Sequence, residues 1–355
     1  MEEENKSKFL GWLKRRKRLL IGIATLLLLI SMIIIVDFVS LIQKIITIGI
    51  IGLILFAIIY TIGFLVRAYK LRLIFKGINI NIGFSSSYFS TGAGLIVNDL
   101  TPAKIGDIVR ILIIKDQDNL KLSESAAGIA IERILDFILI FIVSCFALLF
   151  LYISNYGETS NKASLGFNIQ IFLALGVIFI IGILLALVLL FYKTEFIVGL
   201  FDRFLPKIAN YLNRFVRNFK EGIKKFSEHR KIFLLTILLG IPTWIVDGFI
   251  VILFFYILGY QVNMLVIILA TVLINLSKTF PITPGGWGIS ENIGALFIFF
   301  FYPEILFTEI LSIFIIDHLL RTAYLIIFGG YSLLHYNISL KDIESTKKGV
   351  QLDVL

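Results

Sequence analysis

The sequence predicts an all-α polytopic membrane protein with six full spans and two re-entrant helical hairpins, or alternatively eight full spans. Three observations support this fold class. Apolar residues make up 58% of the 355 residues, which excludes an ordinary soluble domain. Several apolar runs reach the roughly 18–20 residues that a helix needs to cross the hydrocarbon core. Basic residues gather beside these runs, as orientation signals do.

The apolar runs define the six full spans in chain order. We predict them at residues 19–36, 45–66, 126–152, 169–192, 232–258 and 310–334. The first run follows a basic stretch that resembles the start of a signal peptide. That run is long and no small-residue cleavage site follows it, so an uncleaved first helix is favoured.

The distribution of Lys and Arg predicts the orientation of the chain. The N-terminus and residues 67–76 and 193–231 are rich in both, whereas loops 37–44 and 153–168 hold one Lys each. The positive-inside rule therefore places both termini and residues 67–125 and 193–231 in the cytoplasm, in a multi-pass protein of the cell membrane. The net charge of +9 then reflects topology, and we expect no nucleic-acid partner.

This topology divides the chain into three parts. Residues 1–18 form a basic cytoplasmic N-terminus, residues 19–335 a transmembrane domain, and residues 336–355 a cytoplasmic tail. Within the domain, residues 195–231 alternate apolar and basic residues at helical spacing, as in an amphipathic helix on the membrane surface. That helix could bind anionic headgroups, or could serve only as a topology signal.

Two similar helix breaks interrupt residues 84–116 and 264–302. The first is Thr101-Pro102-Ala103-Lys104-Ile105-Gly106, and the second is Thr283-Pro284-Gly285-Gly286-Trp287-Gly288. Proline lacks an amide proton and disfavours helix in the residue before it, so each helix should stop there. The arms on either side are about 14–17 residues long, which suits re-entrant segments better than full spans.

The repeated break divides the domain into residues 19–152 and 169–334, which would have opposite orientations in the membrane. Inverted halves with interrupted helices at matching positions are a recurrent architecture of secondary transporters. The alternative is a chance match, because the shared motif is short. A charged cluster follows each break at a similar distance, which favours the repeat.

Several ionisable residues fall within the apolar segments, where an ionised side chain costs about 2.5–3.5 kcal/mol. The acidic ones could balance charge or carry coupling protons: Glu132, Asp136, Asp247, Glu291 and Asp317. Any single pair, such as Asp317 with Arg321, could simply be a neutralising ion pair. The whole set exceeds what packing needs, which favours a polar cavity between the halves.

The basic residues and the two breaks predict a phosphate-binding site. A helix that starts after Gly106 or Gly288 would point free amides and a positive dipole end into this cavity. The alternative for the first break is an ordinary loop at the membrane surface. The candidate headgroup-binding residues are Lys104, Arg110, Arg133, Lys278, Arg321, Gly285, Gly286 and Gly288.

Signatures of enzymes are weak in this sequence. The three histidines lack metal-ligand spacing, there is one cysteine, and no phosphate-binding Gly-x-x-x-x-Gly-Lys-Ser/Thr loop is present. We therefore expect no catalytic residues, no cofactor and no metal.

Three motifs together resemble the lysylphosphatidylglycerol synthase transmembrane (flippase-like) family. They are Pro102-x-x-x-Gly106-Asp107-x-x-Arg110, Ile131-Glu132-Arg133-x-x-Asp136 and Pro281-x-x-Pro284-Gly285-Gly286-x-Gly288-x-x-Glu291. The resemblance covers about residues 20–335 and implies a membrane domain that translocates lipids. Larger members attach a soluble synthase domain, which this sequence does not show, so lysine transfer to phosphatidylglycerol is not implied.

We therefore expect a flippase that moves a phosphate-bearing lipid, either a phospholipid or a polyprenyl-phosphate-linked sugar, across the membrane. The alternative is a non-catalytic subunit, or an integral-membrane enzyme, that serves a separate glycosyltransferase or synthase. The expected partners are anionic or phosphate-bearing lipids, and the sequence leaves the oligomeric state open.

Overall fold

The computed structural model describes residues 36–101, 105–153, 220–221, 224–226, 228–278 and 283–336. In these ranges the ordered elements are helices, and no strand occurs. This confirms the all-α class. The predicted span 169–192, all but the last residue of span 19–36, most of segment 195–231 and nearly all of the tail lie outside the described residues.

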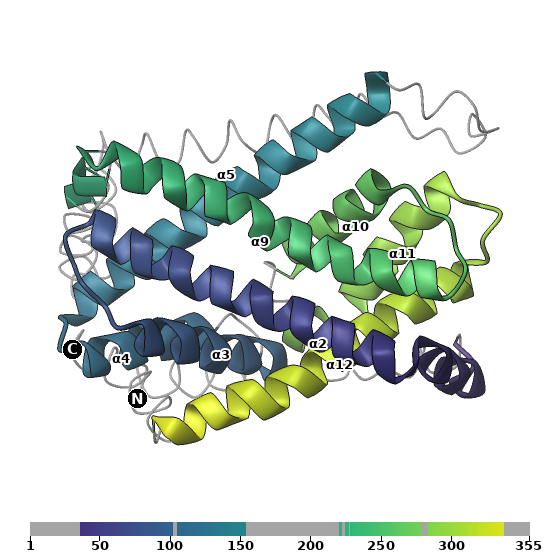
Figure 1. Ribbon diagram of the computed structural model, residues 1–355, viewed down its shortest axis with the longest axis horizontal. Helices are drawn as coiled ribbons and strands as arrows, with labels where there is room; N and C mark the ends of the chain where they lie inside the picture. The colour runs from purple at the N-terminus through teal and green to yellow at the C-terminus, as the bar shows by residue number, and fades with distance from the viewer. Residues whose placement is uncertain are drawn as a thin grey trace, which may run out of the picture.

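Four long helices run along the long axis of the molecule (Figure 1). They are α2 (Phe38–Gly77), α5 (Leu122–Ile153), α9 (Arg230–Ile257) and α12 (Phe307–His335). Of these, α2, α9 and α12 are long and apolar enough to cross a membrane. The predicted spans 126–152, 232–258 and 310–334 agree with α5, α9 and α12 to within a few residues.

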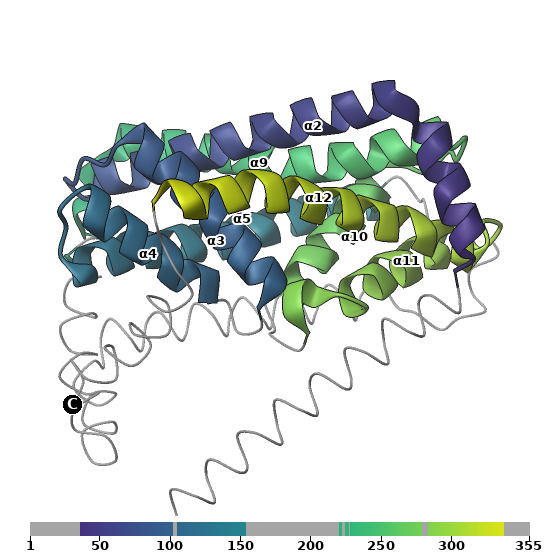
Figure 2. The ribbon, with the colours of Figure 1, turned by 90° about the horizontal axis from the view of Figure 1, so that it is seen from below.

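Helix α2 differs most from its prediction of residues 45–66. It begins at Phe38, where Asp37 accepts a hydrogen bond from the amide of Val39 at 3.1 Å, and it continues to Gly77. A sharp bend divides it at Gly49, whose φ of 63° is a conformation that glycine adopts at little cost (Figure 2). Because the helix runs on past residue 66, Arg67 and Lys70 lie inside it and not in a loop.

Shorter helices form two pairs toward opposite ends of the molecule (Figures 1 and 2). One pair is α3 (Phe84–Leu100) with α4 (Ile105–Gln117). The other is α10 (Met264–Ser277) with α11 (Ile289–Phe301), joined through the short 3₁₀ helix η2 (Pro284–Gly286). Both predicted breaks are confirmed. Helix α11 starts directly after Gly288 as expected, whereas α4 starts at Ile105, ahead of Gly106.

The two short pairs pack in matching ways. Helix α3 contacts α2 and α4, and α10 contacts α9 and α11. Helix α4 packs on α5, as α11 packs on α12. Each short pair also contacts a long helix from the other part of the chain, because α3 packs on α12 and α10 packs on α5. The long helices α2 and α9 lie side by side. The outer faces are apolar, as Ile51 at 72% and Ile327 at 76% exposure illustrate. Large apolar faces of this kind suit lipid and not water.

Candidate functional site

A polar cavity of about 400 Å³ lies where these helices meet. Both helix breaks reach it, through Thr101 on one side and Thr283, Gly285 and Gly286 on the other. Its walls carry an unusual concentration of charge for the inside of an apolar bundle. The acidic and basic lining residues, with the one histidine, are Arg67, Lys70, Asp99, Asp107, Arg110, Glu132, Arg133, Asp136, Asp247, Lys278, His318 and Arg321.

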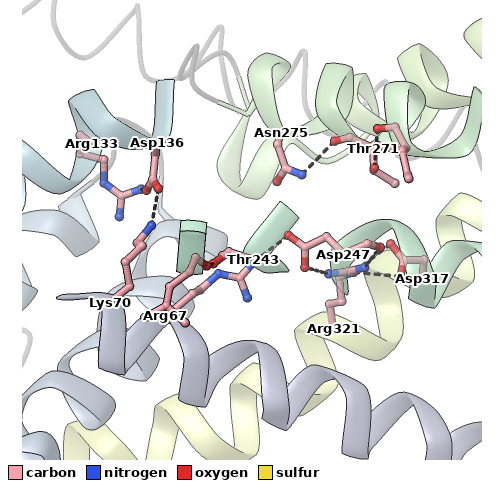
Figure 3. A network of polar contacts seen from close by, with 12 residues as sticks. Arg67, Lys70, Arg133, Asp136, Thr243, Asp247, Thr271, Asn275, Asp317 and Arg321 are labelled. Carbon is pink, nitrogen blue, oxygen red and sulfur yellow. Dashed lines mark hydrogen bonds and ion pairs between the residues drawn. The ribbon is translucent and has the colours of Figure 1, made fainter. Parts of the chain in front are cut away.

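The first cluster of ion pairs joins α4, α5 and α2. Arg110 and Glu132 are almost fully buried and lie 2.8 Å apart from Nη2 to Oε2. Arg133 lies 3.1 Å from Asp107 and 3.7 Å from Asp136. Asp136 also pairs with Lys70 of α2, whose side chain is 1% exposed (Figure 3). Burial at this depth is tolerated because each charge faces an opposite one.

The second cluster joins α12, α9 and α2. The Nε of Arg321 lies 2.8 Å from Asp317 Oδ1, and its Nη1 lies 2.9 Å from Asp247 Oδ1. Arg67 approaches the other oxygen of Asp247 at 2.6 Å, so this carboxylate lies between two guanidinium groups (Figure 3). The ring of Tyr60 lies 5.1 Å from the guanidinium carbon of Arg321.

A third cluster centres on His318 of α12, which is 3% exposed. Its Nδ1 contacts Oε1 of Glu291, and its Nε2 lies 3.2 Å from Oδ1 of Asp99. Asp99 also accepts a hydrogen bond from Thr322 at 2.6 Å. The indole of Trp287 stacks on the imidazole, with the ring centroids 3.9 Å apart and the planes 9° from parallel. Trp287 is half-buried and packs face to face on His318.

The backbone of the second break is built on glycine. Gly285, Gly286 and Gly288 have φ angles of 60°, 80° and 83°, a region that other residues rarely adopt. Glu291 caps the start of α11, because its Oε2 accepts a hydrogen bond from the amide of Gly288 at 2.8 Å. The first break has a similar cap, in which Asn98 accepts from the amide of Gly106 at 2.8 Å.

These caps occupy one backbone amide at each break. A helix that starts after Gly106 or Gly288 was expected to point free amides into the cavity, and the amides of Gly106 and Gly288 themselves each donate to a side chain. Gly288 does not line the cavity either. Satisfying the first amides of a helix with its own polar residues is the usual way to stabilise its start. Gly285 and Gly286 do line the cavity, as predicted.

Lys278 differs from the other basic residues of the cavity wall. Within the part of the chain that the structure describes, Arg67, Lys70, Arg110, Arg133 and Arg321 each have a carboxylate partner within 4.0 Å, whereas Lys278 has none. It follows α10 as its C-cap, and its stem lies against Gly286, where an added Cβ would be 2.8 Å from Lys278 Cγ. Nearby, the buried Oγ1 of Thr283 also lacks a partner among the described residues.

The structure thus brings most of the predicted site residues together. Arg110, Glu132, Arg133, Asp136, Asp247, Lys278, Gly285, Gly286 and Arg321 line the cavity, and Asp317 and Glu291 contact residues that do. Lys104 lies outside the described residues. Across the described ranges, no group of three or more His, Cys, Asp or Glu side chains could hold a metal ion.

Four charged lining residues and one lining histidine were missed by sequence reasoning. Arg67 and Lys70 were interpreted as orientation signals, because the predicted span ended before them. Asp99 and Asp107 bracket the first break, and that position was the available signal. His318 stands inside the charged cluster of the last span, but histidine spacing was examined only for metal ligands.

Comparison with known proteins gives one family match. The family described as "Lysylphosphatidylglycerol synthase TM region" matches residues 19–329. No solved structure matches the chain.

Three curated proteins are similar to this chain at low identity. A UPF0104 membrane protein of Methanocaldococcus jannaschii is 26% identical over 71% of this chain and all of its own length. A UPF0104 membrane protein of Pyrococcus horikoshii is 27% identical over 67% of this chain and 74% of its own. Glycosyltransferase AglD of Haloferax volcanii is 24% identical over 80% of this chain, which spans about half, 49%, of that protein.

Proposed function

Because the chain belongs to the lysylphosphatidylglycerol synthase transmembrane region family, and is therefore a multi-pass membrane protein, we propose that it transports a lipid. The lipid bears a phosphate, either as a phospholipid or as a polyprenyl-phosphate-linked sugar. It crosses the cell membrane with its headgroup in the polar cavity and its tails in the bilayer. The chain itself makes no covalent change to this lipid, and it uses no cofactor.

One observation carries this proposal. Lys278 lines the cavity and has no carboxylate within 4.0 Å among the described residues, while the neighbouring described cations are already paired. An ammonium group with no carboxylate at contact distance favours an anion, and a phosphate satisfies it with strong charge-assisted hydrogen bonds. Thr283 adds a buried hydroxyl with an open hydrogen-bonding capacity on the same wall. Together they form an anion site at the second break.

The paired cations have a second role in this proposal. Arg133 is 35% exposed and lies 3.1 Å from Asp107, so it can exchange that carboxylate for a phosphate. Arg110 is 2% exposed and serves mainly to hold α4 to α5. Arg321 holds α12 to α9 through Asp247 and adds one positive charge to the cavity wall. We assign Lys104 to the same headgroup site from its place in the first break.

We further propose that the transmembrane domain has six full spans and two re-entrant hairpins, α3/α4 and α10/α11. In this arrangement, residues 19–152 and 169–334 are inverted halves, and both termini are cytoplasmic. The matching contacts of the two short pairs support the repeat. So does the position of both breaks on the cavity wall, since interrupted helices at corresponding positions commonly form transporter sites.

Reconstitution of the purified chain tests the transport proposal. The proteoliposomes should contain a fluorescently labelled phosphatidylglycerol or short-chain polyprenyl phosphate. The labelled lipid should become accessible to an impermeant quencher faster than it does in the same vesicles without the protein. Lys278→Met should abolish most of this gain. Lys115→Met is the matched control, because Lys115 lies on α4, is 41% exposed and, among the described residues, forms its ion pair with its neighbour Asp116. Equal rates for both variants would remove Lys278 from the mechanism.

The second candidate is a non-catalytic membrane subunit that presents lipid to a separate glycosyltransferase or synthase. The similarity to about half of a protein named as a glycosyltransferase favours it. Such a subunit would bind the lipid but would not move it alone. Lipid exposure that appears only after a co-purified glycosyltransferase is added would support this candidate over an autonomous transporter.

A further inference from the structure

The arrangement around His318 is separate from the anion site at Lys278 and has its own chemistry. Both ring nitrogens face carboxylate oxygens, Nδ1 that of Glu291 and Nε2 that of Asp99. An ionised carboxylate only accepts hydrogen bonds, whereas a neutral imidazole has one donor nitrogen. With both carboxylates ionised, the two contacts form together as hydrogen bonds only when both ring nitrogens carry a proton.

We propose that His318, between Asp99 and Glu291, is a proton-binding site whose occupancy is coupled to anion binding at Lys278. This inference rests on the proposed transport function. The three residues come from three elements, α12, α3 and α11, so one proton joins both short-helix pairs to α12. Loss of that proton leaves the imidazole with one donor and releases one of the two carboxylates.

The surrounding charges determine how the proton and the anion interact. Lys278 at the end of α10 acts on both Asp99 and Glu291, and Asp317 and Arg321 flank His318 on α12. Thr322 and Ser290 complete the hydrogen bonds of the two carboxylates. The groups that face His318 are therefore two carboxylates and an aromatic ring, with the ammonium group of Lys278 beyond them.

Charge balance in the cavity links the two events. The described cations that line the cavity are Arg67, Lys70, Arg110, Arg133, Lys278 and Arg321. The described carboxylates that line it or contact its lining residues are Asp99, Asp107, Glu132, Asp136, Asp247, Glu291 and Asp317. With His318 protonated, cations and carboxylates are equal in number. With His318 neutral, the set carries one excess negative charge, which opposes a phosphate. Linkage is reciprocal, so a bound phosphate must also favour the protonated histidine.

The proton has a route to the cavity. His318 and Asp99 line the cavity wall, whereas Glu291 is 2% exposed and does not. The proton on Nε2 can therefore pass through Asp99 to water in the cavity, while the bond to Glu291 keeps the ring in place. In this exchange the imidazolium loses one proton and water gains it, with no other reactant.

The stacked ring of Trp287 provides a direct measurement. An imidazolium quenches a stacked indole more strongly than a neutral imidazole does. In a Trp12→Phe, Trp244→Phe background, Trp287 is the remaining tryptophan of the sequence. Its fluorescence in nanodiscs should rise with pH in a single titration. The titration should vanish in His318→Gln and persist in His335→Gln, the matched control, since His335 is an exposed histidine of the same helix.

A second variant and a ligand complete the test. Glu291→Gln should move the titration midpoint to lower pH, because a carboxylate that favours the protonated ring is lost. Dihexanoyl phosphatidylglycerol, as the soluble probe, should move the midpoint to higher pH in the wild-type background and not with Lys278→Met.

The outcomes separate the two proposals. A titration that survives His318→Gln, or that neither Glu291→Gln nor the probe moves, overturns the proton site and leaves the transport assay unaffected. Failure of lipid transport in proteoliposomes, alongside a His318-dependent titration, overturns the transport function and keeps the proton site.

Discussion

Arg321 of α12 and Asp247 of α9 are joined by two hydrogen bonds, one to the carboxylate at 2.9 Å and one to the backbone oxygen at 3.0 Å. These residues lie 74 positions apart in the sequence. Arg321 also holds Asp317 one turn before it on the same helix. The pair therefore connects two long helices at the cavity wall, and it gives the first prediction.

Arg321→Ala should destabilise the fold and abolish lipid transport. Removal of one partner of a buried ion pair typically costs about 3–5 kcal/mol, because it leaves an uncompensated charge. Asp247 would keep Arg67, whereas Asp317 would have no cation within contact distance among the described residues. Thermal unfolding in detergent measures the loss. Arg230→Ala, at an exposed position of α9, should leave the midpoint nearly unchanged.

The Arg110–Glu132 pair predicts strong coupling in a double-mutant cycle. Both side chains are almost fully buried and lie 2.8 Å apart. Arg110→Leu or Glu132→Leu alone should each lower stability by up to about 3–5 kcal/mol, since the remaining buried charge keeps only a more distant partner, Asp107 at 3.8 Å from Arg110 or Arg133 at 4.0 Å from Glu132. The double variant should lose much less than the sum of the two. Additive losses would show that the two charges have other adequate partners.

The contact between α3 and α4 predicts that Gly106 tolerates no side chain. A Cβ at Gly106 would lie 1.8 Å from the backbone oxygen of Gly94, so Gly106→Ala must force the helices apart. Overpacking of this kind costs about 1–3 kcal/mol or more. Gly330→Ala is the matched control, because its Cβ meets nothing within 4 Å. At position 330 the higher helix propensity of alanine should raise the free energy of unfolding by up to about 1 kcal/mol.

Glu291→Gln should slow lipid transport with only a modest loss of stability. Glutamine can still accept the hydrogen bond from the Gly288 amide and so keep the cap of α11. It cannot balance the charge of a protonated His318, which the carboxylate contacts through Oε1. Proteoliposome transport rates and thermal unfolding, compared with those of the exposed Glu304→Gln, separate the two effects. An unchanged transport rate would exclude Glu291 from the mechanism.

The sequence alone determined the helical class, the approximate ends of α5, α9 and α12, and both helix breaks. These features depend on local physics. Apolar runs must satisfy their backbone hydrogen bonds internally, which selects helices in lipid. Proline and glycine interrupt a helix wherever they occur. The sequence also identified most of the charged residues of the cavity, because charge inside an apolar run requires a partner.

The tertiary structure decided which partner each charge has. The sequence paired Arg321 with Asp317 by helical spacing, yet Asp247 lies on another helix. Arg67 and Lys70 entered the site only because α2 continues past residue 66 and packs along α9. His318 lies between Asp99 and Glu291 because α3 and α11 both pack on α12. Long-range packing brings these atoms together, and no local pattern in the sequence encodes those distances.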